Sequence, residues 1–526
     1  MKRLMIGAGI TALLLLGLVS KNGPVPGIAD EVRNTSPDPL VSDWVRTWGG
    51  SSAKDQAQVN KMAADKQGNL YVAGNFSGTV DFNPDPAAFD WRASEAGSID
   101  AFLCKFDPKG KLLWTRTWGG NKRDTAYGVD VDRFGNAYVV GPFRSTVDFD
   151  PDPVKTAIQT SNATGGQVYE NNVFLSKFAP DGSFQWVRTW GPKIVPGKSA
   201  FGAEGYNVAV AGDCLYVAGD FSGDRVDFNP WGGHDWHANH VPATGLVFFD
   251  VFLSKFDLDG TFQWARTWGG EGYDDGPGVA VDGEGNVYVA GMYASREINF
   301  DPAGGKAGLG YPAQDSGIQV DVFLSKFDAA GRFKWVRTWG SKGSEEAMGS
   351  VCVDRMKNVY VCGRFTSNNC DFNPRGKPDI HSTQGGQDLF LSKFDSEGNF
   401  QWARTWGGRG DDQGGVTIDR AGNPYAWGWF CDTVDFDPGN GTDRRVSNGK
   451  QDLFFSRFDP NGSFNWVQTL GGPDKETGSV MLDDSGNLYA GGSFAGTVDF
   501  DPGRGIDSRT ASGARAAFLG KFLLRQ

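Results

Sequence analysis

The sequence predicts an all-β protein in which one four-stranded unit occurs seven times. Three observations lead to this prediction. Four short motifs recur together with a mean spacing of about 70 residues. Gly makes up 75 of 526 residues and aromatic residues make up 13%, a composition typical of short strands joined by tight turns. No amphipathic helical pattern follows residue 30, so helices are not expected in the repeated region.

The motif Trp-x-Arg-Thr-Trp-Gly marks the repeat most clearly. Its six copies begin at Trp44, Trp114, Trp186, Trp264, Trp335 and Trp402, and a degenerate seventh begins at Trp466. The motif Phe-Leu-x-Lys-Phe begins at Phe102, Phe174, Phe252, Phe323 and Phe390, with variants at Phe454 and Phe518. The motif Asp-Phe-x-Pro, in which x is Asn or Asp, begins at Asp81, Asp148, Asp227, Asp371, Asp435 and Asp499, with a variant at Asn299. Each unit also has one Tyr within an apolar strand. A residue needed once for catalysis need not occur seven times, so we interpret the repeated residues as buried aromatics and paired charges between units.

The fourth unit shows how one repeat divides into strands. Its four apolar segments span residues 278–282, 286–291, 321–327 and 332–339. The link from the first to the second segment and the link from the third to the fourth both have the spacing Asp-x-x-Gly. This spacing predicts a type I turn followed by a glycine with positive φ. The fifth unit has Lys357 where this glycine belongs, so Lys357 is predicted to adopt positive φ.

The two ends of the repeated region complement each other. The chain enters it with an outer strand at residues 44–48, and its last segment, residues 516–522, has no outer strand after it. Pairing the two closes a ring and removes two exposed sheet edges, whereas the alternative, an open solenoid, needs polar caps that the sequence does not show. The predicted fold is therefore a seven-bladed β-propeller of four-stranded blades, with the N-terminal strand as the outer strand of the last blade.

The N-terminal segment has the pattern of a secretory signal peptide. Lys2 and Arg3 precede an apolar run over residues 4–19, which is shorter than the roughly 20 residues that a membrane-spanning helix needs. We predict a signal peptide over residues 1–29, with an uncleaved N-terminal anchor as the alternative. Residues 30–42 are predicted to be a linker and residues 43–526 a single propeller. The expected location is outside the cell or in the periplasm and cell envelope.

Composition excludes several functional classes. The net charge of −12 gives no electrostatic basis for binding nucleic acid. Only four His are present, and the motifs H-E-x-x-H, C-x-x-C, G-x-S-x-G and G-x-G-x-x-G are missing from the sequence, so we predict that the protein is not an enzyme. The six Cys occupy unrepeated positions, and Cys352 and Cys362 are the one plausible disulfide pair.

Binding residues are expected on the face that carries the longer, variable connections. In each unit, the link between the second and third strands and the link from the fourth strand to the next unit lie on one face of the disc. Binding sites tend to lie in variable loops that a rigid scaffold holds in place. Trp91, Trp231 and Trp236 lie in these loops and are the predicted ligand-binding residues, because Trp offers a large, rigid contact area. The alternative is that these side chains fold back into small local cores.

Two groups of residues in the same loops are candidate metal ligands. Asp81, Asn83 and Asp85, and likewise Asp148, Asp150 and Asp152, place oxygen ligands at alternate positions as calcium loops do. The alternative is a strand that ends at Pro with Asp capping its turn. His234, His237 and His240, with Asp235 between them, could hold Zn²⁺ or Cu²⁺, or could lie in a solvated loop. Calcium is the candidate cofactor.

The repeated segments resemble the bacterial β-propeller repeat family known as SBBP. The resemblance rests on Asp274-Asp275, the run from Val279 to Gly291, and the segment Asp321-Val-Phe-Leu-Ser-Lys-Phe-Asp328. It implies a propeller outside the cytoplasm and implies no particular reaction. The third unit departs from the family pattern, because Gly212-Asp213-Cys214 shortens one turn.

These observations predict a non-enzymatic binding or scaffold module that recognises a protein or glycan partner through its long-loop face. The alternative is an extracytoplasmic enzyme, a polysaccharide hydrolase or lyase, with carboxylates at the central channel. Such an enzyme would need a pair of carboxylates about 5–10 Å apart. Unrepeated acids that converge at the mouth of the channel would favour this alternative.

Overall fold

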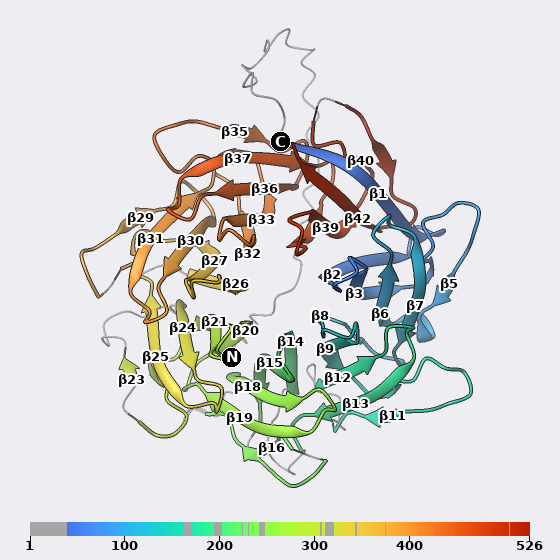
Figure 1. The fold of residues 1–526 in the computed structure, drawn as a ribbon, viewed down its shortest axis with the longest axis horizontal. Helices are drawn as coiled ribbons and strands as arrows, with labels where there is room; N and C mark the ends of the chain where they lie inside the picture. The colour runs from blue at the N-terminus through green and yellow to red at the C-terminus, as the bar shows by residue number, and fades with distance from the viewer. Residues whose placement is uncertain are drawn as a thin grey trace, which may run out of the picture. The chain divides into compact units, whose positions relative to one another are not determined.

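A computed structural model describes residues 39–162, 171–193, 202–223, 225–229, 231–240, 248–305, 308–310, 320–341, 345–373, 375–503 and 505–525. Within them, seven four-stranded antiparallel sheets surround a central axis as the blades of a propeller (Figure 1). The described part of the chain has one helical element, the 3-10 turn η1 (Glu95–Gly97). The predicted all-β, seven-bladed fold is therefore confirmed.

The strands of each blade follow one another from the axis outward. Blade 1 has β2 (Gln56–Ala64), β3 (Leu70–Ser77), β6 (Ile99–Phe106) and β7 (Leu112–Trp118). Blade 2 has β8 (Gly128–Val131), β9 (Ala137–Phe143), β12 (Asn172–Phe178) and β13 (Phe184–Trp190). Blade 3 has β14 (Gly202–Ala211), β15 (Cys214–Ser222), β18 (Asp250–Asp257) and β19 (Phe262–Trp268). Blade 4 has β20 (Asp274–Val281), β21 (Val287–Tyr293), β24 (Asp321–Phe327) and β25 (Phe333–Trp339).

The remaining three blades have the same order. Blade 5 has β26 (Glu345–Val353), β27 (Val359–Phe365), β30 (Asp388–Phe394) and β31 (Phe400–Trp406). Blade 6 has β32 (Gln413–Ile418), β33 (Pro424–Phe430), β36 (Asp452–Phe458) and β37 (Phe464–Leu470). Blade 7 has β38 (Thr477–Leu482), β39 (Leu488–Phe494), β42 (Ala516–Leu524) and β1 (Leu40–Gly50).

The N-terminal strand β1 closes the ring as predicted. It pairs antiparallel with β42, from Leu40 opposite Leu524 to Trp48 opposite Ala517. The strand begins at Leu40, inside the segment predicted as a linker over residues 30–42. Leu40 is fully buried in the core of blade 7, and this burial explains the earlier start.

The hydrophobic core lies between the blades. One cluster joins Tyr71 and Ala73 of blade 1 with Phe174 and Phe178 of blade 2, and Trp118 packs against both phenylalanines. The middle strands are buried on both faces, as their apolar sequence predicted, because a neighbouring blade covers each face.

The repeated polar residues join each blade to the next. Arg116 donates from Nε to the carbonyl of Gly182 at 2.7 Å, and both Trp114 and Lys105 donate to the carbonyl of Pro180. All three acceptors belong to the turn between β12 and β13 of the following blade. The prediction that these residues are structural is confirmed, but their main partners are backbone carbonyls rather than charges. Turn carbonyls have no partner in a sheet, so these donors satisfy them.

Each connection between the second and third strands contains a small hairpin that the sequence analysis did not predict. The pairs are β4 (Thr79–Asp81) with β5 (Trp91–Ala93), β10 (Thr146–Asp148) with β11 (Ile158–Thr160), β16 (Val226–Asp227) with β17 (Trp236–His237), β22 (Glu297–Asn299) with β23 (Gly308–Gly310), β28 (Asn368–Asp371) with β29 (Ile380–Ser382), β34 (Thr433–Asp435) with β35 (Arg444–Val446), and β40 (Thr497–Asp499) with β41 (Ser508–Thr510). They lie around the periphery in Figure 1, and we call them the hairpin collar.

The hairpin collar ties neighbouring blades together at their outer edges. Gly49 and Gly50, at the end of the outer strand of blade 7, pair with Asp81 and Val80 in the hairpin of blade 1. The same bridge recurs elsewhere, for example between Gly471 and Asp499. The connections expected to be variable loops therefore share a repeated hairpin, while the segment after the hairpin differs in length, with residues 94–98 in blade 1 and residues 238–249 in blade 3.

The turn prediction at Lys357 is confirmed. Lys357 has φ of 65°, close to the 81° of Gly285 at the corresponding position of blade 4. The main chain of both turns closes alike, since the amides of Lys357 and Gly285 donate to the carbonyls of Asp354 and Asp282. A lysine therefore occupies the left-handed region that favours glycine.

We expect Gly285→Lys to lower the free energy of unfolding by about 1–2 kcal/mol, because it places a Cβ in the left-handed conformation. A Cβ at this position would also lie 3.2 Å from Cβ of Ala329, a tight contact. The reverse change, Lys357→Gly, is expected to raise stability or leave it unchanged. Urea unfolding of both variants tests this, and a stable Gly285→Lys beside a destabilised Lys357→Gly would contradict the turn assignment.

Candidate functional site

The acidic residues predicted to bind calcium cap turns in the hairpin collar. Oδ1 of Asp81 accepts the amides of Asn83 at 3.1 Å and Asp90 at 2.7 Å. Oδ1 of Asp148 does the same for Asp150 and Ala157. The other predicted side-chain oxygens also accept backbone amides two residues further on. Asn83 accepts the amide of Asp85, Asp85 that of Ala87, Asp150 that of Asp152, and Asp152 that of Val154. This geometry matches the alternative of Asp capping its turn.

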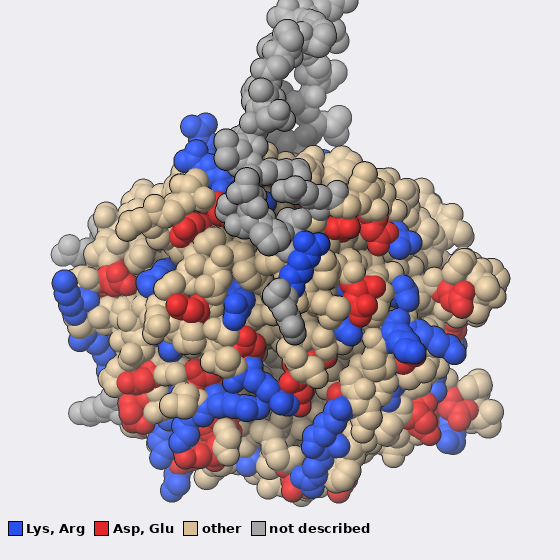
Figure 2. All heavy atoms as spheres, turned by 45° about the horizontal axis from the view of Figure 1, so that its top comes forward, with Lys and Arg blue, Asp and Glu red and all other residues tan. Residues whose placement is uncertain are grey.

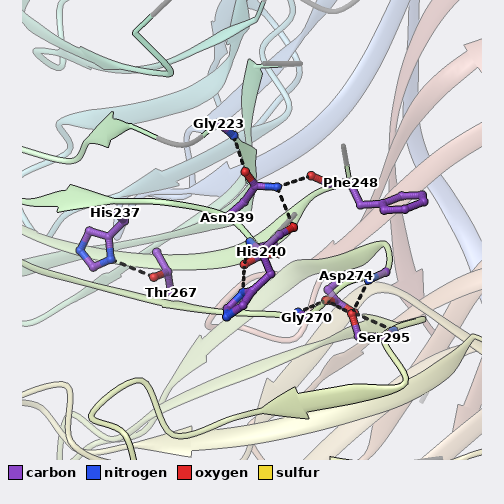
Figure 3. A network of polar contacts seen from close by, with 11 residues as sticks. Gly223, His237, Asn239, His240, Phe248, Thr267, Gly270, Asp274 and Ser295 are labelled. Atoms are coloured by element: carbon purple, nitrogen blue, oxygen red, sulfur yellow. Dashed lines mark hydrogen bonds and ion pairs between the residues drawn. The ribbon is translucent and has the colours of Figure 1, made fainter. Parts of the chain in front are cut away.

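The three histidines of the blade 3 hairpin have three separate partners. Nδ1 of His234 lies 2.6 Å from Oδ2 of Asp227, and Nδ1 of His237 lies 2.8 Å from the hydroxyl of Thr267. Nδ1 of His240 lies 2.7 Å from Oδ2 of Asp250, and this hydrogen bond raises the pKa of His240. Figure 3 shows His237 and His240 pointing to different partners. The structure therefore does not bring the three imidazoles together around one point.

No group of three or more His, Cys, Asp or Glu side chains suited to a metal occurs in the ranges that the structure describes. The predicted calcium and zinc sites remain predictions. Because the oxygens already accept backbone amides, we expect neither Ca²⁺ nor Zn²⁺ at millimolar concentration to raise the melting temperature. An ion that binds only the folded chain would raise it, so a clear increase with either metal would establish a site.

The three tryptophans predicted to bind a ligand differ in their exposure to solvent. Trp91 is 48% exposed and stacks on Phe89, which is 69% exposed. Trp231 is also exposed, with the guanidinium of Arg188 5.3 Å from its ring centroid. Trp236 is half-buried, and its ring is already contacted by His234 and by the cationic groups of Arg225 and Lys193. Trp91 and Trp231 are therefore both accessible, at 48% and 54% exposure, and Trp91 is the one that forms a stacked pair with a second exposed ring, Phe89.

Cys352 and Cys362 do not form the disulfide that the sequence made plausible. Neither thiol is in a disulfide. In the pairing of β26 with β27, Cys352 lies opposite Tyr360, and Cys362 lies opposite Ser350. The two cysteines are therefore diagonal neighbours on the same face of the sheet. Diagonal positions lie about 7–8 Å apart, which is too far for a disulfide unless the backbone moves.

The structure brings together an unrepeated polar cluster that the sequence analysis missed. Glu204 on β14 lies directly opposite Asp220 on β15. The hydroxyls of Tyr206 and Tyr273 lie 3.3 Å and 3.5 Å from Oδ2 of Asp220, and Asp275 on β20 is close enough to influence all three. We call these five residues the inner cluster. Directly opposed Cβ atoms lie about 5 Å apart, so the carboxyls of Glu204 and Asp220 are close neighbours.

The inner cluster is electrostatically unusual. Burial, followed by the negative charges of Asp275 and Glu204, raises the pKa of Asp220 well above its ordinary value. Burial also raises the pKa of Glu204, although Arg144 and Arg123 oppose this. Arg144 is hydrogen-bonded to Asn171, which is hydrogen-bonded to Glu204. A comparison of equivalent strands could have found the pair of Glu204 and Asp220. At the same positions blade 1 has Gln58 opposite Asn75, and blade 7 has Thr477 opposite Ser493, which are uncharged pairs.

Buried carboxyl pairs recur at the junctions between blades. In each pair an acid at the start of a third strand lies near an acid at the start of the next blade. Burial, and to a smaller extent the charge of the first acid, raises the pKa of the second. The pairs are Asp100 with Asp124, Asp250 with Asp274, Asp388 with Asp412, and Asp452 with Glu476. The Gly-Gly that follows the outer strand allows this approach. A side chain at Gly407 would collide with the carboxyl of Asp388.

The fold and the repeats define the class of this chain as a β-propeller repeat protein. Residues 263–292 match the family model for SBBP, described as a beta-propeller repeat, which confirms the resemblance for that part of the chain.

Two curated proteins are similar to this chain at low identity. The chain is 21% identical to an uncharacterized WD repeat-containing protein, L264, of Acanthamoeba polyphaga mimivirus, over 83% of the chain and 35% of the relative. It is 24% identical to the regulatory protein FlaEY of Caulobacter vibrioides, over 88% of the chain and 46% of the relative. The chain thus spans less than half the length of either protein. Among solved structures, a protein of unknown function from Dyadobacter fermentans aligns with 93% of the chain and 100% of its own at 10% identity and a TM-score of 0.38.

Proposed function

We propose that this propeller is a non-enzymatic scaffold outside the cytoplasm that binds a protein partner through its hairpin collar. The main support is where exposed apolar side chains lie. Eight of the twelve large apolar side chains exposed among the described residues are on the collar: Phe89, Trp91, Val154, Ile158, Trp231, Ile380, Val446 and Ile506. Phe89 and Trp91 stack on each other, whereas the other six are spread over the hairpins of five further blades. Adjoining exposed apolar groups are typical of an interaction surface. Proteins named as WD-repeat and regulatory proteins among the relatives are consistent with this role.

The opposite face offers a poorer surface for a partner. Its short turns expose Phe134 and Met356 singly. On the side of the molecule drawn in Figure 2, acidic and basic side chains are interspersed, so this surface does not favour a partner selected by one sign of charge. Among the described residues no helix combines the length and hydropathy needed to cross a bilayer. A glycan partner could stack on the exposed ring of Trp91 or on that of Trp231.

A photo-crosslinking amino acid placed at Trp91 or at Phe134 tests this proposal. We expect a specific crosslinked partner from position 91 and none from position 134. Once the partner is purified, Phe89→Ala combined with Trp91→Ala should weaken binding about tenfold or more, because aromatic anchors dominate interfaces, while Phe134→Ala should not. Equal crosslinking from both positions would contradict the proposal. Fusion of residues 1–29 to a reporter that is active only after export tests the location.

The enzymatic alternative is supported by a single structural feature, the unrepeated acids of the inner cluster. Burial raises the pKa of Glu204, as a general acid requires, and Asp220 lies directly opposite. Release of reducing or unsaturated ends from a panel of polysaccharides, lost in Glu204→Gln, would favour catalysis over scaffolding.

A further inference from the structure

The inner cluster lies apart from the hairpin collar and plays no part in the proposed scaffold. It is formed by the inner strands β14 and β15 of blade 3, by β20 of blade 4 and by Tyr273 just before β20, near the axis in Figure 1. Among the described strand pairs, an acid lies opposite an acid at this register in blade 3 alone, although Asp275 of blade 4 and Glu346 of blade 5 occupy the position of Glu204.

Asp220 has an incomplete set of hydrogen bonds. The residue is 1% exposed, and its Oδ2 faces the hydroxyls of Tyr206 and Tyr273. Its Oδ1 has no hydrogen-bond partner among the residues that the structure describes. A buried carboxylate oxygen without a donor is costly, and in native proteins it calls for an ion, a ligand or a proton at that point.

Asp220 also has no cation among its hydrogen-bond partners in the described structure. The charged groups that act on it most strongly, Asp275 and Glu204, are both negative. Glu204 is connected to the cation Arg144 through a hydrogen bond to Asn171. The hydrogen-bond partners of Asp220 in the described structure are instead two neutral tyrosines. A bound cation would supply both the missing donor and the missing positive charge.

The aromatic rings around this carboxylate are held in place. Tyr206 stacks on Tyr127 with centroids 5.7 Å apart, and Tyr273 contacts Phe249 edge-on at 5.8 Å. Tyr206, Tyr273, Glu204 and Asp275 are half-buried, whereas Asp220 is fully buried among them. The negative faces of phenol rings attract organic cations.

We propose that the inner cluster binds an alkylammonium group, with an N–H of the ammonium donating to Oδ1 of Asp220 and the alkyl part lying against Tyr206 and Tyr273. A neutral hydroxyl could also donate to Oδ1 but would leave the clustered negative charge uncompensated. Calcium would need six or more oxygen ligands, and no group of three acids suited to a metal occurs among the described residues. A primary alkylammonium ion can donate a hydrogen bond to the carboxylate and also contact the aromatic rings.

Isothermal titration of the full chain with n-butylammonium chloride at pH 8 tests the proposal, with n-butanol as the uncharged control and calcium chloride as the metal control. We expect n-butylammonium to bind and n-butanol and calcium not to bind. Burial raises the pKa of Asp220, so a cation that favours its ionised form displaces a proton. The heat of binding should therefore depend on the ionisation enthalpy of the buffer.

Two nearly isosteric variants locate the site. Asp220→Asn should weaken n-butylammonium binding about tenfold or more, the effect of losing a charge-assisted hydrogen bond, and should abolish proton release. Glu204→Gln provides a second test should Asp220→Asn fold poorly, and it should weaken binding to a smaller extent. Asp388→Asn makes the same chemical change at a buried carboxyl pair elsewhere and should leave the affinity unchanged.

Three results would overturn the proposal. The first is no binding of n-butylammonium at concentrations far above millimolar. The second is equal binding of n-butanol, which would indicate an apolar pocket. The third is unchanged n-butylammonium affinity in both Asp220→Asn and Glu204→Gln. A gain in stability in Asp220→Asn without any amine binding to the parent chain would show that the carboxyls share a proton and serve only the fold. None of these outcomes bears on partner binding at the hairpin collar.

Discussion

A chain that begins at Ser51 is expected to lose most of the stability of a chain that begins at Pro39. The shorter chain lacks β1, and with it three buried side chains, Leu40, Val45 and Trp48. Burial of side chains of this size contributes about 1.5–3 kcal/mol each, so the three together are comparable to the total stability of about 5–15 kcal/mol of a typical domain. The deletion also leaves one edge of β42 unpaired and open to solvent, and such an edge favours aggregation.

Size-exclusion chromatography and urea unfolding of both chains measure this effect. The chain that begins at Pro39 retains every residue of β1 and is the matched control. If the chain that begins at Ser51 stays monomeric with the same unfolding midpoint as the control, the ring does not depend on β1, and the observed pairing with β42 is energetically unimportant.

The second large effect is expected at the buried carboxyl pairs, where Asp388→Asn should stabilise the protein at pH 8. Burial raises the pKa of Asp388 to about 6, and burial with the charge of Asp388 raises the pKa of Asp412 to about 8. Oδ2 of Asp388 accepts the amide of Gln384, and Oδ1 has no hydrogen-bond partner among the described residues. An asparagine can keep the first bond and place its NH₂ where Oδ1 stands, facing Asp412.

The direction of the pH dependence follows from the raised pKa values. Between the unfolded pKa of about 3.9 and the folded values near 6 and 8, the folded chain binds more protons than the unfolded chain. The stability contributed by the protonated pair is therefore complete below about pH 4 and is lost as the pH rises towards 8. We expect Asp388→Asn to raise the free energy of unfolding by about 1–3 kcal/mol at pH 8, and by much less at pH 5.

Urea unfolding at pH 5 and pH 8 measures this difference, and Asp85→Asn is the control. Asp85 is exposed and its Oδ1 accepts the amide of Ala87, a bond that asparagine can keep, so the same loss of charge should have little effect at either pH. A destabilising effect of Asp388→Asn that is the same at both pH values would show that Asp388 is ionised in the folded chain.

The repeat made the fold predictable to the level of single residues. Seven copies of one unit allowed each strand to be placed by comparison with its equivalents, and the conformation of Lys357 followed from the glycine at the same position elsewhere. The start of β1 was placed too late, because Leu40 lies before the first recognisable motif and is recruited by its pairing with Leu524. The hairpin collar was missed because its strands are only two to four residues long and are too short for a hydrophobic period.

The candidate sites were predicted less well than the fold. The acids of the Asp-Phe-x-Pro motif and the three histidines have the composition of metal sites, but the sequence could not show that the oxygen of Asp81 and the imidazole of His240 find their partners locally, in backbone amides and in Asp250. Liganding depends on several groups converging on one point, and such convergence is a property of three-dimensional geometry.

The number of blades, the strands within each blade and the closure of the ring follow from the sequence alone, because they depend on local patterns that recur at a fixed spacing. Which unrepeated residues meet depends instead on how the strands pair and the blades pack. Glu204 and Asp220 are 16 positions apart, and Asp275 lies in another unit, yet these contacts place them around one buried carboxylate. The low dielectric of that environment gives their charges an influence on one another that they would lack in the unfolded chain, where water separates and screens them.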